Sequence, residues 1–462
     1  MQPVLIVGAG PVGLLQALML SRLEVPVILL DRHLAHLEAP KAHVISSRSL
    51  EVCRQYGLPA SKIRSYGTSR EDARWVRFVT NLSGEEVGIL PFFRLEPDVL
   101  EYTPEDDTGV TSTIENTYTG EQLSMNSALV IACDGANSKI VRSLGISSEM
   151  EESADTVMTI HFRADLRPVV EDRVGMLHWI MDPAVRGVII AYDLSGNLVL
   201  LHNFDNLQQQ LITDAHNLAY KLAAAYHGWA DLSAVLAAYQ AERQPVALRN
   251  AWQSVFYGRK VFDLVKAFKT TEPDVEKATL AMHAALADTE QRQVIEEKVQ
   301  DQADQFNSPG YNAERTTEYI PAYRRGARLV HAWINAKNTS VLPSLPPVDF
   351  AYLGNDMSDE QKEKRQYSLL DLIPPDSYVV LCGPNQRKYV ELCELLQRSS
   401  IPARLVVCGK DFTFTDEVPD GYGLSKGNAV LIRPDQHVEL VIENETVEEI
   451  VKHIASSLHA QH

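Results

Sequence analysis

The sequence predicts an α/β protein in which a parallel-sheet domain carries an inserted antiparallel sheet and is followed by a smaller α/β module. Residues 4–31 read as strand, glycine-rich turn, helix and strand. Short apolar strands separated by turn residues run from 158 to 204, which is typical of an antiparallel sheet. After a proline- and serine-rich stretch at 335–349, strands and helices alternate to residue 458.

Further elements follow from periodicity. Helices are predicted at 14–23, 49–56, 214–226, 244–267, 274–302, 387–397 and 446–458. Strands are predicted at 73–78, 87–90, 108–118, 128–132, 158–162, 176–181, 188–192, 198–204, 378–381, 403–407, 429–433 and 438–441. Side chains alternate along a strand, so Val188, Ile190 and Tyr192 should share one face of their strand. In the strand 198–204 the same alternation groups Leu198, Leu200, His202 and Phe204.

Composition excludes several classes of protein. The 462 residues are 45% apolar and 23% charged, as in ordinary globular proteins, and allow two or three domains. The net charge of −18 would repel phosphate backbones, so no nucleic-acid partner is expected. The five cysteines form no CxxC pair and no His cluster has metal spacing, which predicts reduced thiols in a cytoplasmic protein without a metal site. No apolar run approaches a membrane span.

The first turn, Gly8-Ala-Gly-Pro-Val-Gly13, has the spacing of a dinucleotide-binding motif. Gly8 permits the tight turn, Gly10 lets the backbone approach a pyrophosphate, and Gly13 allows close packing of helix on strand. The helix N-terminus would face the phosphates with its free N–H groups. Asp31, at the end of the second strand, could accept hydrogen bonds from ribose hydroxyls. The alternative is that the glycines are kept only for packing.

More motifs follow in order along nearly the whole chain. They lie at 47–51, including Arg48, at 133–138, including Asp134 and Gly135, and at 214–222, 242–246, 325–333 and 428–438. Together they resemble the group A flavoprotein monooxygenases, in particular the phenol-hydroxylase branch with a C-terminal thioredoxin-like domain. The resemblance implies a Rossmann-like FAD-binding domain of the PHBH type, an inserted antiparallel β-sheet substrate domain, and a thioredoxin-like α/β domain.

The resemblance also implies domain limits and residue roles. The FAD-binding-like domain would take residues 1–80, 105–150 and 213–265, and the substrate domain 81–104 and 151–212. A helical segment and inter-domain connection would follow at 266–334, a linker at 335–349 and the thioredoxin-like domain at 350–462. Arg48 would touch the flavin's phosphates or ribityl chain, and Asp134 and Gly135 would touch FAD and the nicotinamide cofactor. A homodimer is expected by the same resemblance.

Two segments that the family carries are missing from this chain. The family places a strand ending in Gly-Asp, and then a Pro- and Gly-rich loop, directly before the helix that matches residues 214–222. Here the predicted strand 198–204 leads into that helix with neither, and only 80 residues separate Asp134 from Asp214. A second segment is missing between residues 101 and 108. Both losses fall where the resemblance places the flavin ring.

We therefore expect a chain that has lost functional FAD and catalyses a non-redox step on a hydrophobic natural-product intermediate. A [4+2] cycloaddition, an isomerisation or a dehydration would need only a folded substrate and one hydrogen bond to a carbonyl. A FAD- and NAD(P)H-dependent aromatic hydroxylase is the first alternative, and a non-catalytic binding protein the second. The candidate catalytic residues are Trp179, Tyr192, His202 and Asn203, each of which could instead be an ordinary sheet residue. Helix packing and capping are expected to explain Asp214 and His216.

Overall fold

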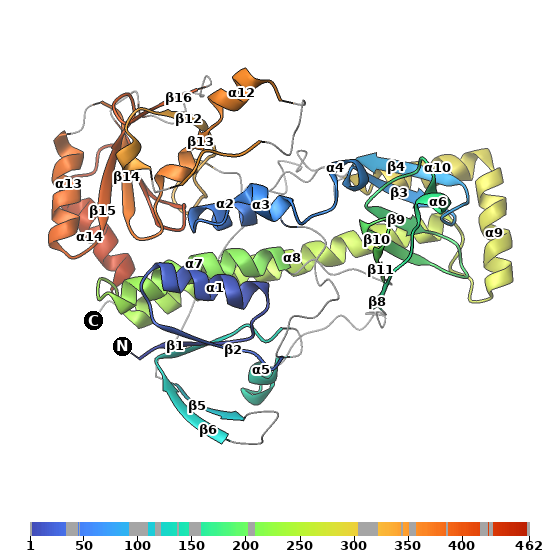
Figure 1. The fold of residues 1–462 in the computed structure, drawn as a ribbon, viewed down its shortest axis with the longest axis horizontal. Helices are drawn as coiled ribbons and strands as arrows, with labels where there is room; N and C mark the ends of the chain where they lie inside the picture. Colours follow the sequence, from blue (N-terminus) through green and yellow to red (C-terminus); the bar gives the residue numbers. More distant parts are fainter. Residues whose placement is uncertain are drawn as a thin grey trace.

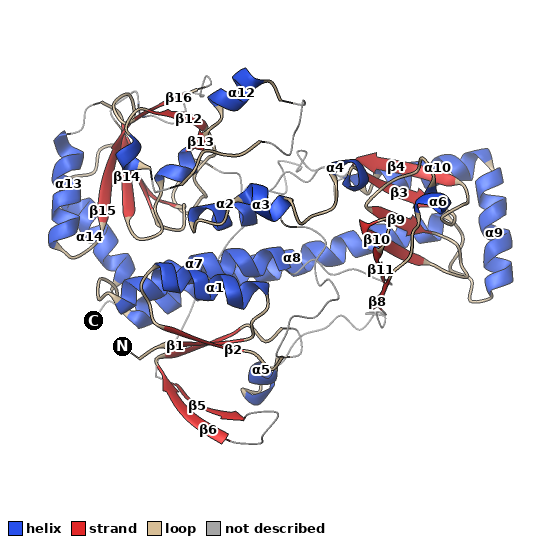
Figure 2. Cartoon of the chain, in the orientation of Figure 1, coloured by secondary structure: helices blue, strands red, loops and turns tan. Residues whose placement is uncertain are grey.

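The computed structural model describes residues 2–33, 45, 47–91, 110–115, 122–135, 138–146, 159–201, 208–303, 322–342, 345–350, 357–384, 387–415, 424 and 428–459. The molecule has three parts, an N-terminal unit, an inserted sheet and a C-terminal module; the inserted sheet lies at one end of the long axis, and the other two parts lie toward the opposite end (Figure 1). Each of them combines helices and strands (Figure 2). The helix α8 (Leu232–Ala267) runs from the N-terminal unit to the inserted sheet.

The N-terminal unit is built on a three-stranded parallel sheet in the order β2 (Val27–Leu30), β1 (Val4–Val7), β7 (Leu129–Ala132). The helices α1 (Pro11–Arg22), α2 (Ser47–Gln55) and α7 (Gln208–Tyr226) pack on it through one apolar core. The predicted strand, turn, helix and strand at 4–31 are confirmed. The remaining elements here are α3 (Ala60–Arg64), α4 (Arg70–Ala73), the hairpin of β5 (Val110–Glu115) and β6 (Gln122–Ser127), and α5 (Lys139–Ser143).

The inserted sheet has six strands, ordered β4-β3-β9-β10-β11-β8. Their bounds are β3 (Trp75–Val79), β4 (Glu86–Pro91), β8 (Thr159–Phe162), β9 (Leu177–Ile180), β10 (Gly187–Asp193) and β11 (Asn197–Leu201). All pairs are antiparallel except β3 with β9, which are parallel. Because β3 belongs to this sheet, the predicted boundary at residue 80 is too late, and the first domain ends before Trp75.

The two faces of this sheet carry separate cores. Val188, Ile190 and the half-buried Tyr192 pack with the end of α8 and the helices α9 (Val275–Ala287) and α10 (Thr289–Gln300), which confirms their shared face. Leu198 and Leu200 pack on the opposite face, in a core that includes a residue of α6 (Arg167–Val170). The prediction for the strand 198–204 therefore groups these side chains correctly, but their face is not that of Tyr192.

Two predicted helix limits are wrong for identifiable reasons. The segment 274–302 forms two helices, because Asp288 is extended (φ −81°, ψ 121°) and its carboxylate accepts the N–H of Gln291 at 2.7 Å, which starts α10. The helix α7 begins at Gln208, six residues before the predicted start. Asp214 is therefore inside α7 and does not cap it.

The C-terminal module contains a four-stranded sheet and a three-stranded sheet. The four-stranded sheet has the order β15 (Ala403–Val407), β14 (Tyr378–Cys382), β17 (Ala429–Ile432), β18 (Val438–Ile442), with α13 (Arg387–Arg398) and α14 (Val447–Leu458) beside it. The other has the order β13 (Tyr367–Ser368), β12 (Trp333–Ala336), β16 (Phe412–Phe414), and η1 (Thr339–Val341), α12 (Asp359–Lys364) and η3 (Leu369–Leu372) complete the module. Since β12 lies in it, the module starts before the predicted residue 350.

Candidate nucleotide-binding site

The glycine-rich turn between β1 and α1 shows which glycines packing requires. Gly8 has φ +107°, and a Cβ on it would lie 2.2 Å from the carbonyl oxygen of Cys133. A Cβ on Gly13 would lie 1.8 Å from the carbonyl oxygen of Gly8. A Cβ on Gly10, in contrast, would meet none of the described heavy atoms within 4 Å. Packing thus accounts for two of the three glycines, and the space at Gly10 is free for a ligand.

The first turn of α1 and Asp31 lie at the same edge of the sheet. Gly10 is the N-cap of α1, and no side chain of the described chain caps it, so the helix N-terminus can receive an anion. The Asp31 carboxylate accepts the N–H groups of His33 at 2.7 Å and Ala9 at 2.6 Å. These backbone bonds lower the pKa of Asp31. An ionised carboxylate beside the turn suits the hydroxyls of a ribose.

The end of β7 completes this edge. One carboxylate oxygen of Asp134, Oδ2, accepts the N–H of Lys139 at 2.9 Å. The other, Oδ1, is buried and has no hydrogen-bond partner among the residues that the structure describes. Gly135 follows with φ +81° and open space beside it within the described chain. An unsatisfied buried acceptor is costly, so a ligand donor at Oδ1 would be favourable. The geometry fits the adenosine diphosphate part of a dinucleotide.

Arg48 is held by groups of the C-terminal module, and its predicted contact with the flavin's phosphates or ribityl chain stays a prediction. Its side chain is only 4% exposed and is turned toward the C-terminal module. Nη1 donates to Gln436 Oε1 at 2.5 Å, and Nη2 donates to the carbonyl of Asp435 at 3.1 Å. Arg48 is thus bound to protein groups, so the flavin half of the predicted cofactor site is not supported by this contact.

Asp214 and His216 serve packing, as predicted for the helix that carries them. Asp214 Oδ1 accepts from Arg243 Nε at 2.6 Å. His216 is fully enclosed between Gln55 Oε1, at 2.6 Å from its Nε2, and Arg48. Burial, and then the charge of Arg48, holds the pKa of His216 well below its ordinary value.

The structure describes two of the four candidate catalytic residues, Trp179 and Tyr192. Trp179 stacks on Phe78, with ring centroids 6.2 Å apart and planes 8° apart, and both pack in the core beneath α8. Tyr192 lies against the same core, and burial raises the pKa of its hydroxyl to about 12. His202 and Asn203 lie outside the described residues. Trp179 and Tyr192 therefore share a sheet face, whereas their catalytic role stays a prediction.

Sequence reasoning missed a buried charge cluster between α7, α8 and the C-terminal module. Glu242 accepts from Lys221 at 2.9 Å and from Arg433 at 2.7 Å, and Arg433 also binds Asp435 at 2.9 Å. Burial lowers the pKa of Lys221 to about 8. Burial alone would raise the pKa of Glu242, but the charges of Arg433 and Lys221 hold it at about 2. These residues lie in the motifs at 214–222, 242–246 and 428–438. The sequence shows the motifs, but it does not show that their charged side chains meet in the folded chain.

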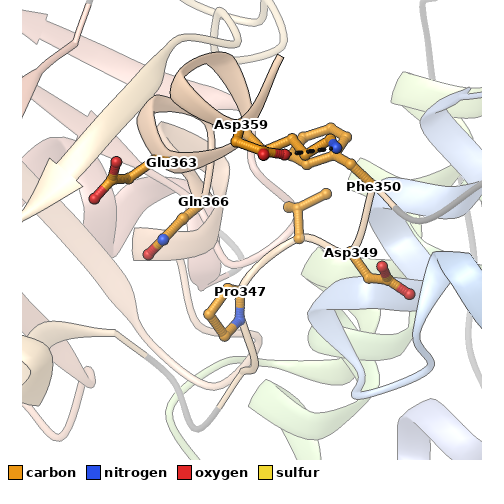
Figure 3. A pocket seen from close by; sticks show the side chains of 8 residues that line it. Pro347, Asp349, Phe350, Asp359, Glu363 and Gln366 are labelled. Carbon is orange, nitrogen blue, oxygen red and sulfur yellow. Dashed lines mark hydrogen bonds and ion pairs between the residues drawn. The ribbon is translucent and has the colours of Figure 1, made fainter. Parts of the chain in front are cut away.

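A shallow cavity of about 480 Å³ lies elsewhere, at the edge of the C-terminal module (Figure 3). Its lining residues are Pro347, Val348, Asp349, Phe350, Asp359, Lys362, Glu363 and Gln366. Three of these residues belong to α12, which lies apart from α1 (Figure 1), and none of them belongs to the candidate site. Within the described ranges no group of His, Cys, Asp or Glu could hold a metal ion. Likewise, none of the described helices is long and apolar enough to cross a membrane.

Comparison with known proteins agrees with this fold. A family model described as an FAD binding domain matches residues 1–87, 85–204 and 211–254. Tetracenomycin A2 monooxygenase-dioxygenase of Streptomyces glaucescens is 25% identical over 571 positions, covering 94% of this chain and 92% of the relative. The 2,4-dichlorophenol 6-monooxygenase of Delftia acidovorans is 21% identical over 569 positions, covering 94% of both. Both alignments exceed the 462 residues of the chain, so these relatives have segments without a counterpart here.

Solved structures show the same architecture. The flavin-dependent monooxygenase PieE, in complex with FAD and substrate, superposes with a TM-score of 0.76 at 20% identity over 99% of both chains. RebC, a rebeccamycin biosynthetic enzyme with reduced flavin, gives 0.72 at 20% identity over 99% of both chains. With the family match over more than half of its residues, the chain belongs to the FAD-binding domain family of the group A flavoprotein monooxygenases.

Proposed function

We propose that this chain binds the adenosine diphosphate part of a dinucleotide but has lost the seat of the flavin ring. On this proposal it catalyses a non-redox step on a hydrophobic natural-product intermediate, namely a cyclisation such as a [4+2] cycloaddition, an isomerisation or a dehydration. One observation carries the proposal. The strand β11 ends at Leu201 and α7 begins at Gln208, so only residues 202–207 connect the inserted sheet to α7.

Six residues are too few for the strand ending in Gly-Asp and the Pro- and Gly-rich loop that the family places before this helix. Fully extended, they reach about 20 Å, enough for a connection but not for a further strand and a loop. A flavin hydroxylase needs a supported ring in a site closed to water, because the protein contributes binding, orientation and electrostatics to the cofactor's chemistry. The guanidinium of Arg48 is also bound to Gln436 and Asp435. These facts support a site that holds the nucleotide without orienting the ring.

The substrate class rests on two partly buried aromatic side chains and on the relatives. Trp179 and Tyr192 pack against the apolar core that the sheet forms with α8, α9 and α10. The Tyr192 hydroxyl keeps its proton across the physiological range, since burial raises its pKa to about 12, so it could donate a hydrogen bond to a carbonyl. Several matched proteins are named for natural products, among them tetracenomycin A2 monooxygenase-dioxygenase. These features support a hydrophobic natural-product intermediate as the substrate.

A second function is favoured by the intact edge of the parallel sheet. Among the described residues, the space at Gly10 is free and Oδ1 of Asp134 has no partner, and both features fit FAD as well as any other adenosine dinucleotide. If a substitute loop supports the ring, the chain is a FAD- and NAD(P)H-dependent aromatic hydroxylase.

The experiment that separates the two functions is a ligand survey of the purified full-length chain. Visible absorbance and mass spectrometry identify any bound flavin, and calorimetric titration compares ADP with FAD. The first function predicts a colourless protein whose affinities for ADP and FAD agree within about tenfold, because the ring adds no contacts. A yellow protein that prefers FAD by much more, and oxidises NAD(P)H when a phenol is added, would establish the hydroxylase instead.

A further inference from the structure

The polar face of α2 holds the C-terminal module. Arg54 donates to both carboxylate oxygens of Asp371, at 2.8 and 3.1 Å. Gln55 Nε2 donates to the carbonyls of Ile373 at 2.9 Å and Pro434 at 2.8 Å. Figure 1 shows α2 lying between this module and α7. The helix is thus tied to two turns of the module, η3 and the turn between β17 and β18.

The second of these turns contains a residue in an unusual conformation. The N–H of Gln436 donates to the carbonyl of Arg433 at 2.9 Å, which closes the turn, and Gln436 itself has φ +64°. Glycine is the ordinary residue for this left-handed position after a hairpin turn, because any Cβ is crowded there. Gln436 therefore carries backbone strain that glycine would avoid.

The side chain of Gln436 gives the reason for tolerating this strain. It is 2% exposed, its Oε1 accepts from Arg48 at 2.5 Å, and its Nε2 donates to the carbonyl of Leu370 at 3.1 Å. One carboxamide therefore bridges α2 and η3. A glycine at this position has no side chain and could make neither bond.

The adjoining apolar side of α2 belongs to the core of the nucleotide site. Val52 and Cys53 pack in the same apolar cluster as Val4 and Ile6 of β1, the strand that leads into the glycine-rich turn. Any displacement of α2 therefore reaches the strand that ends at Gly8. The helix joins the C-terminal module on one side to the nucleotide-binding edge on the other.

We infer that the two side-chain hydrogen bonds of Gln436, here called the latch, hold α2 against the C-terminal module. We infer also that docking of the module and nucleotide binding are coupled through α2. The coupling rests on the nucleotide binding proposed above, whereas the latch itself does not. The latch keeps Arg48 within the domain interface. Opening it would loosen α2 and alter affinity at the glycine-rich turn.

The test compares two substitutions that relieve the same kind of strain. Gln436→Gly removes the strain and the bridge together. Ser400→Gly is the matched control, since Ser400 is an exposed residue of the same module with φ +61°. Hydrogen exchange of the full chain is followed at residues 47–55 with and without ADP. The latch predicts that Gln436→Gly speeds exchange there by tenfold or more, whereas Ser400→Gly leaves it unchanged.

Each outcome decides one part of the inference. If both variants leave residues 47–55 as protected as in the parent chain, there is no latch. If ADP protects residues 433–437 in the parent chain but not in Gln436→Gly, the coupling holds. If ADP binds but leaves exchange at 433–437 unchanged in the parent chain, the coupling is wrong. It is also wrong if ADP changes exchange at 433–437 equally in the parent chain and in Gln436→Gly. If ADP and FAD both fail to bind, the coupling and the proposed function fall together, while exchange at 47–55 still decides the latch.

Discussion

Gly10 provides the sharpest test of whether the glycine-rich turn binds a nucleotide or is kept for packing alone. We predict that Gly10→Ala leaves the fold intact and weakens nucleotide binding, while Gly13→Ala destabilises the fold. The two glycines are three residues apart in one turn, yet a Cβ meets open space at the first and the carbonyl oxygen of Gly8, at 1.8 Å, at the second. If the turn binds a nucleotide, the alanine at Gly10 therefore weakens binding and leaves stability nearly unchanged. If the glycines serve packing alone, the alanine at Gly10 has little effect on either quantity.

The magnitudes follow from these distances. Gly10 has φ −69° and ψ 177°, which alanine adopts freely. The substitution lowers the conformational entropy of the unfolded chain, which stabilises the fold and opposes the weaker helix cap, so the free energy of unfolding should change by less than about 1 kcal/mol. At Gly13 the helix α1 must move away from β1, which costs about 1–3 kcal/mol or more. A methyl at Gly10 that crowds a phosphate would cost a similar amount of binding free energy, a rise in Kd of roughly 5- to 150-fold.

Urea unfolding measures the stability of both variants, and calorimetric titration with ADP measures binding. Retained ADP affinity in Gly10→Ala would refute the reasoning, because the open space would then not be the ligand's. A loss of stability in Gly10→Ala equal to that in Gly13→Ala would refute it as well. So would a parent chain that binds no ADP, since packing would then be the only role left for the turn.

Three further predictions concern the charged groups. Glu242→Gln leaves the buried Lys221 without its carboxylate partner and should lower the unfolding free energy by about 3–5 kcal/mol in urea. The exposed Asp263→Asn should lower it by about 0–1 kcal/mol, and equal losses in the two variants would contradict the prediction. Burial keeps His216 neutral in the folded chain while the unfolded chain takes up a proton below about pH 6.5, so stability should fall with decreasing pH by up to about 1.4 kcal/mol per unit. An unchanged slope in His216→Gln would assign that dependence elsewhere. Asp31→Ala should weaken ADP binding about tenfold in titration, and unchanged affinity would remove Asp31 from the site.

Local patterns were sufficient for most of the fold. Periodicity and turn residues located β1, α1 and β2, and the spacing of Gly8, Gly10 and Gly13 located the turn between them. The pattern failed at Asp288, where an apolar helical period continues across a residue that in fact caps a new helix. It also failed at the domain boundary near Trp75, because one of the two partners of β3, the strand β9, is about a hundred residues away in the chain.

The sequence by itself determined the family, the order of the elements and the shortness of the connection between β11 and α7, because glycine spacing, periodicity and length are properties of neighbouring residues. Only the tertiary structure decided the partners of the charged groups. Arg48 and Gln436 are 388 positions apart, and their 2.5 Å contact depends on how the C-terminal module docks on α2. Long-range contacts of this kind carry no local signature, since each partner is chosen by the packing of whole elements.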